Sequence, residues 1–151
     1  MIDIHTAILQ VSMSFLGSLG FSVLFNVRGK KVLLAALGGG ISWAIFLLLA
    51  DWIPEVPYRY FCCACFVATY SEVLARILKT PVTTFLIPSM IPHIPGSALY
   101  KTMRFALNKE WMTCAEQAYY TFKLALALAL GSAVILTVFN VIRLIRRRSK
   151  E

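Results

Sequence analysis

One carboxylate lies where a membrane segment should not carry a charge. Glu72 belongs to an apolar stretch that ends at Lys79, and a helix at about 1.5 Å per residue places it roughly 10 Å from that end. Carboxylates at such depth are costly and usually mark ion paths, proton relays or substrate contacts. Thr69 and Arg76 share its helix face, so an ion pair with Arg76 is the alternative that needs no transport role. We favour a functional site that contains Glu72 and Arg76.

A proline-rich stretch follows within an apolar region. Each internal proline removes a backbone donor, and the freed carbonyls must be enclosed by protein or line a wet cavity. A helix that resumes near Gly96 would offer an amino-terminal dipole to an anionic group, as broken helices do in transporters. We expect a substrate or proton pathway here, formed by Pro81, Pro88, Ser89, Pro92, His93, Pro95, Gly96 and Ser97.

The first apolar segment carries polar residues every four positions, at Ser14, Ser18, Ser22 and Asn26. This spacing places them on one helix face. The stripe could line a substrate path, with Ser18, Ser22 and Asn26 as its candidate residues. It could equally be a packing face, because serine and glycine permit close helix approach in membranes.

Other reactive residues do not assemble into a known site. Cys62, Cys63 and Cys65 contain a C-x-x-C spacing, but they lie in an apolar span without a second pair, where cysteines pack as small hydrophobes. His93 has only His5 as a histidine partner, and the sequence contains no HExxH motif. We therefore predict no enzyme activity, no metal site and no cofactor.

The elements that position these residues follow from composition. The chain has 151 residues, of which 59% are hydrophobic and 15% charged, against about 25% charged in soluble domains. At about 20 residues per crossing, this length allows four or five membrane spans and no separate soluble domain. The first segment has no cleavage signal and is expected to remain as a membrane helix.

We predict an all-α, polytopic helical membrane protein that forms a single integral membrane domain over residues 1–151. About five transmembrane helices are expected, with a proline-broken fourth span and a basic tail at 143–151. A four-span arrangement with a re-entrant proline segment is the alternative. The predicted spans are 4–27, 32–50, 58–78, 81–107 (broken) and 114–142.

The net charge is +8, and the positions of the basic residues indicate how the chain is oriented in the membrane. Basic residues gather beside apolar stretches, at 28–31, at Arg76 with Lys79, and at 143–150, which is typical of the cytoplasmic flanks of membrane helices. An odd number of crossings places all three groups in the cytoplasm and the amino terminus outside. This distribution argues against nucleic acid as a partner.

The arrangement of Glu72, Lys79-x-Pro81, Phe85, Pro88, Pro92, Pro95-Gly96 and Tyr100 resembles the threonine/serine exporter (ThrE-type) family. The chain looks like the small, separately encoded carboxy-terminal module of a split exporter. The resemblance implies a secondary exporter of small polar metabolites in the bacterial inner membrane, driven by the proton gradient. Its implied substrates are threonine and serine, or small dicarboxylates such as succinate. It assigns function to Glu72, Pro81, Pro88, Pro92, Pro95 and Gly96, and it implies a larger ThrE-type membrane subunit as partner.

 The leading hypothesis is therefore an exporter subunit in which Glu72 carries a proton or pairs with a substrate ammonium. A second hypothesis is a non-transporting assembly subunit whose small-residue faces bind a partner, and the partner contains the substrate path. A membrane-embedded enzyme is a remote third, and it would require an essential His93. Four or five spans enclose little interior, so we expect a homo- or hetero-oligomer surrounded by lipid.

Overall fold

The computed structural model describes residues 3–148, without the side chains of residues 146 and 147. It is all-α, as the sequence predicts. The helices are α1 (Ile4–Leu24), α2 (Lys30–Leu48), α3 (Val56–Ile77), α4 (Thr83–Met90), α5 (Gly96–Leu107) and α6 (Trp111–Arg148), with a 3-10 turn, η1 (Ile91–His93), between α4 and α5.

Within residues 3–148, four helices are long and apolar enough to cross a membrane: α1, α2, α3 and the Trp111–Ile145 part of α6. The prediction of five spans is therefore wrong. The segment 81–107 is divided into α4, η1 and α5, because the prolines remove the donors that a continuous helix requires. Its last part, α5, has only 12 residues and carries Lys101 and Arg104.

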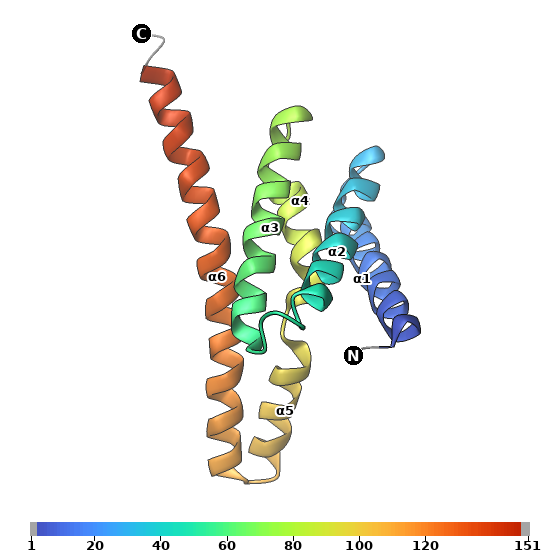
Figure 1. Cartoon of the computed structure of the whole chain (residues 1–151), viewed down its shortest axis with the longest axis vertical. Coiled ribbons are helices and arrows are strands. Elements are labelled where there is room, and N and C mark those ends of the chain that lie inside the picture. Colours follow the sequence, from blue (N-terminus) through green and yellow to red (C-terminus); the bar gives the residue numbers. More distant parts are fainter. Residues whose placement is uncertain (1–2, 149–151) are drawn as a thin grey trace.

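The broken segment still runs from one end of the bundle to the other (Figure 1). The α1–α2 connection, the carboxyl end of α3 and the carboxyl end of α6 lie at the same end of the bundle. The basic residues of 28–31, Arg76 and Arg143 therefore gather at this end, which we call the basic end.

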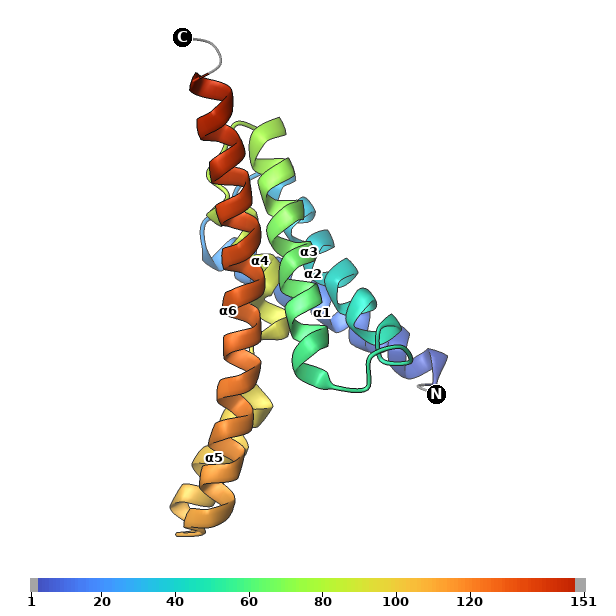
Figure 2. The same ribbon diagram turned by 60° about the vertical axis from the view of Figure 1, so that its left-hand side comes forward.

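At the opposite end, α5 and the beginning of α6 form a hairpin that projects beyond the other helices (Figures 1 and 2). The 38 residues of α6 extend over about 57 Å, which exceeds the roughly 30 Å hydrocarbon core of a bilayer. Thr102 and Thr121 join the two helices through their hydroxyls at 3.3 Å. The hairpin is thus the part of the chain that lies outside the hydrocarbon when the apolar part of α6 spans it.

Helix α1 ends in a turn that recurs after α3 and α5. Asn26 has a φ of 58°, and the next amide, that of Val27, donates to the carbonyl of Ser22 at 3.0 Å. This is the Schellman arrangement, in which a left-handed residue lets two amides satisfy the last helical carbonyls. The turn fixes the position of Asn26 at the basic end.

Candidate substrate and proton pathway

A run of three glycines in α2 is the point where several elements approach one another. A Cβ at Gly38 would lie 2.5 Å from the Ser89 hydroxyl of α4 and 2.7 Å from the Tyr70 ring of α3. A Cβ at Gly39 would overlap the side chain of Ser18 in α1. The missing side chains therefore allow α1, α3 and α4 to pack on α2 together.

The hydroxyls around this run are buried and mostly satisfied by backbone. Ser89 donates to the carbonyl of Ala35 at 2.9 Å, and this bond ties the broken segment to α2. Ser22 donates to the carbonyl of Ser18 at 2.7 Å, whereas the buried hydroxyl of Ser18 has no partner within residues 3–148. The serine stripe thus faces the interior, where it packs and also supplies a free polar group.

His93 is enclosed by aromatic rings at the break between α4 and α5. The ring centroids of Trp43, Phe46 and Tyr60 lie 5.6, 6.1 and 6.0 Å from that of the imidazole. The side chain is fully buried, and among the described residues neither ring nitrogen has a hydrogen-bond partner. Burying an unpaired polar group costs free energy, so His93 is a candidate functional residue.

Glu72 lies between α3 and α6 and contacts two arginines. Its Oε2 atom accepts a hydrogen bond from Nε of Arg76 at 3.3 Å and lies 3.7 Å from Nη2 of Arg143. Glu72 is only 2% exposed, and Cζ of Arg76 lies 4.7 Å from the centroid of the Phe139 ring. The ion pairs of this cluster therefore link α3 to α6 near the basic end.

A small polar pocket opens between the end of α1 and the beginning of α4. Its volume is about 270 Å³, and it is lined by residues 25–27 with Thr83, Thr84, Ile87 and Pro88. Next to it, Nε of Arg28 donates to the side-chain oxygen of Asn26 at 3.1 Å. The pocket lies at the basic end and joins segments that are distant in sequence.

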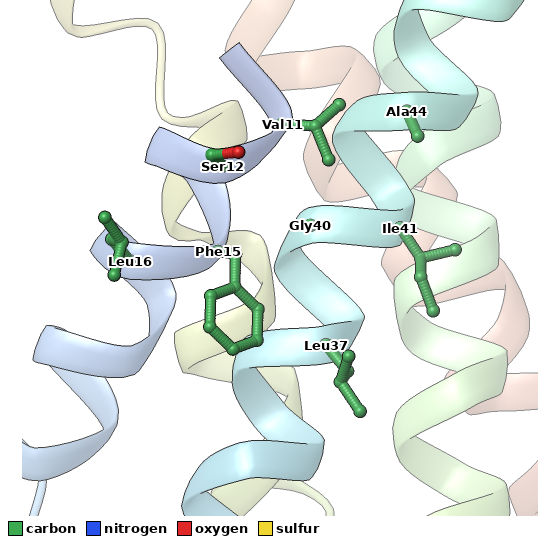
Figure 3. Close-up of a pocket in the computed structure, with 8 residues that line it drawn as sticks. All are labelled: Val11, Ser12, Phe15, Leu16, Leu37, Gly40, Ile41 and Ala44. Carbon is green, nitrogen blue, oxygen red and sulfur yellow. The ribbon is translucent and has the colours of Figure 1, made fainter. Parts of the chain in front are cut away.

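A larger groove of about 470 Å³ lies between α1 and α2, and Figure 3 shows its lining. Leu16, Leu37, Ile41 and Phe15 surround it, and Ser12 is the single hydroxyl among the lining residues. A zwitterion or dicarboxylate would leave its charges unpaired in such a groove. The polar pocket, rather than this groove, suits a charged metabolite.

The geometry alone does not distinguish a transport protein from a membrane-embedded enzyme. The comparison with known families does. The model of the family described as "Threonine/Serine exporter, ThrE" matches residues 10–138. The chain belongs to the threonine/serine exporter family. No curated protein and no solved structure matches it.

Membership in the threonine/serine exporter family confirms the resemblance predicted from the sequence. It implies a transport role rather than an enzymatic one. Together with the four apolar helices, it identifies a multi-pass membrane protein. Within residues 3–148, no group of three or more histidine, cysteine or acidic residues could hold a metal ion.

The structure divides the predicted site residues of this exporter-family chain into three places. The glycine run of α2 lies beside Ser18, Ser89 and Pro92, whereas Glu72 and Arg76 lie between α3 and α6. Asn26 and Pro88 line the pocket at the basic end. Of the remaining residues, Pro81, Gly96 and Ser97 are exposed, and Ser22, His93 and Pro95 are buried.

Sequence reasoning missed Arg143, and it also missed the glycine run. In the sequence Arg143 belongs to the basic tail, and no local pattern connects it with Glu72. The run Gly38-Gly39-Gly40 was a usable signal, since adjacent small residues mark close helix approach in membranes.

The two arginines of the cluster are expected to contribute unequally to stability. Arg76→Met should lower the free energy of unfolding by about 1–2 kcal/mol, because it removes a charge-assisted hydrogen bond from a guanidinium that is partly exposed. Arg143→Met should cost less, since its contact with Glu72 is longer. Thermal unfolding in detergent, arranged as a double-mutant cycle, measures both effects.

The double variant should lose more than the sum of the single losses, because Glu72 would then be buried without a counter-charge. Strictly additive losses would show that the arginines do not share the carboxylate.

Proposed function

We propose that the chain is a membrane subunit of a proton-coupled secondary exporter of threonine, serine or a related small carboxylate such as succinate. The observation that carries the proposal is the buried, ion-paired Glu72 in a chain of the threonine/serine exporter family. A membrane helix rarely retains a carboxylate without a functional reason.

The proposed substrate path follows the broken segment where it packs on α1 and α2. Broken helices suit this role, because they expose backbone groups to a polar ligand inside a membrane protein. Ser18, Ser89 and His93 would supply hydrogen bonds along the path, and the prolines would keep the segment from closing into a regular helix.

Glu72 would link proton movement to a change in the packing of α3 against α6. As a carboxylate it holds Arg76 and Arg143. Protonation would remove its charge and weaken both contacts, which would free α6 to move relative to α3. The cycle then alternates between a closed, ion-paired state and an open, protonated state.

We further propose that the basic end faces the cytoplasm, which places the amino terminus outside. This follows the excess of lysine and arginine in cytoplasmic connections. The chain would function with a larger ThrE-type membrane subunit. Much of its helix surface is available for such contacts, since only 11% of the apolar window of α1 and 6% of that of α6 are buried within the chain.

Export from loaded cells tests the proposal. Cells that express the chain with its partner subunit are loaded with labelled threonine, serine or succinate, and efflux is followed against cells with an empty vector. We expect faster efflux of at least one substrate, and we expect an uncoupler of the proton gradient to abolish the gain. Efflux equal to that of the empty-vector cells, for all three substrates, would refute the exporter assignment.

A further inference from the structure

A groove of about 310 Å³ lies between the beginning of α3 and α6, at the end of the bundle opposite to the basic end (Figure 1). We call it the α3–α6 groove. Its polar lining residues are Glu55, Tyr58 and Lys123, and its apolar lining includes Phe61, Leu126 and Leu130. The groove therefore combines two opposite charges with an apolar wall.

Lys123 lies at the boundary of the apolar part of α6. Residues 124–142 carry no charge, and at about 1.5 Å per residue they extend over roughly 28 Å, close to the roughly 30 Å of the hydrocarbon core. Nζ of Lys123 also lies 4.4 Å from the centroid of the Tyr119 ring, and tyrosines are enriched at the membrane–water interface. Lys123 therefore lies at the level of the lipid headgroups.

From this level the α3–α6 groove continues into the hydrocarbon. Both helices run from this end toward the basic end (Figures 1 and 2). Leu126 and Leu130 lie about 5 and 10 Å further along α6 than Lys123, and Phe61 follows Glu55 by more than one turn of α3. The groove thus has the polarity of a phospholipid, with charges at the headgroup level and apolar side chains below them.

The two charged residues of the groove are available to a ligand. Both ion pairs found among residues 3–148 involve Glu72, so within this part of the chain neither Glu55 nor Lys123 has an ion-pair partner. Arg59, one turn after Glu55, lies over the Phe46 ring at 4.8 Å instead. A carboxylate favours a ligand ammonium, and a lysine favours a ligand phosphate.

We propose that the α3–α6 groove binds one phospholipid whose headgroup carries both a phosphate and a primary ammonium, as in phosphatidylethanolamine. The phosphate would contact Lys123, the ammonium would contact Glu55, and one acyl chain would lie along Phe61 and Leu130. A trimethylated ammonium has no N–H to donate to Glu55, and a glycerol headgroup has no positive charge. The site shares no residue with the proposed export path, so it does not depend on the proposed function.

Native mass spectrometry of the full chain in detergent measures the binding directly. The probes are phosphatidylethanolamine, phosphatidylcholine and phosphatidylglycerol with identical acyl chains. The Kd of phosphatidylethanolamine should be at least about tenfold lower than that of the other two, because a hydrogen bond between charged groups contributes enough free energy for such a ratio. Soluble glycerophosphoethanolamine should not displace the lipid, since it lacks the chains that would fill the apolar wall.

Two substitutions separate the two charges of the headgroup. Lys123→Met should raise the Kd of all three lipids by about tenfold, because each carries a phosphate. Glu55→Gln should raise only the Kd of phosphatidylethanolamine and remove its advantage over phosphatidylcholine. Lys101→Met and Glu116→Gln are the matched controls, because they make the same charge changes at exposed positions of the α5–α6 hairpin and should leave every Kd unchanged.

Equal affinity for phosphatidylethanolamine and phosphatidylcholine in the unsubstituted chain would overturn the proposed recognition of the ammonium. Unchanged affinity in both Lys123→Met and Glu55→Gln would overturn the site. Displacement by glycerophosphoethanolamine would show that a soluble phosphate ester, and not a lipid, is the ligand. If the complex with the larger subunit binds no phosphatidylethanolamine and Lys123→Met dissociates that complex, the groove is a subunit interface and the lipid site is refuted.

Discussion

Glu72→Gln is expected to reduce export to the level of cells without the chain, while the protein still assembles in the membrane. The glutamine side chain has nearly the same shape as glutamate but carries no charge and cannot take up and release a proton. Arg76 and Arg143 would lose their shared counter-charge, and both are exposed enough, at 38% and 49% of their side chains, to remain hydrated. Folding should therefore survive where transport does not.

The measurement is efflux of labelled threonine, serine and succinate from loaded cells, with the amount of protein in the membrane determined in parallel. Glu116→Gln is the matched control, because Glu116 is an exposed glutamate of α6 and should leave efflux unchanged. Glu72→Asp keeps the titratable group on a shorter side chain and should retain part of the activity. Undiminished efflux from Glu72→Gln would remove Glu72 from the mechanism and favour the assembly-subunit hypothesis.

The sequence predicted the membrane helices well because hydropathy acts locally. Three of the long helices correspond to the first three predicted spans, and the last predicted span lies within α6. The count was wrong at residues 81–107, where apolar composition suggested a crossing but the prolines and the cations of α5 divide the segment. Local composition also could not show that α6 begins well outside the apolar stretch, because its early residues are held by packing with α5.

The candidate site was predictable where a residue conflicts with its surroundings. Glu72 could be found because a carboxylate in an apolar helix is unusual, and the serine spacing indicated one shared helix face, on which Ser18 and Ser22 are buried and Asn26 is exposed. Contacts between distant segments were not predictable. The pairing of Glu72 with Arg143 and the meeting of Asn26 with Thr84 depend on helix packing, which a single sequence does not record.

The close packing of α3 against α6 at Gly131 should make the protein's stability sensitive to a single added methyl group. A Cβ at Gly131 would lie 2.6 Å from the carbonyl oxygen of Phe61 and 2.8 Å from the Cβ of Ala64. Gly131→Ala should therefore force the helices apart and cost about 1–3 kcal/mol of folding free energy, as overpacking does. The nearest atom belongs to the backbone of α3, so a side-chain rotation cannot relieve the clash. Thermal unfolding in detergent measures the loss.

Gly17→Ala is the matched control, because a Cβ at Gly17 meets nothing within 4 Å and alanine favours a helix by up to about 1 kcal/mol. Its melting temperature should stay the same or rise. Since α3 and α6 also carry Glu72 and Arg143, separating them at Gly131 should weaken the ion pair and lower export together with stability. A Gly131→Ala protein that is as stable and as active as Gly17→Ala would show that the close contact of α3 and α6 is not required for the fold or for coupling.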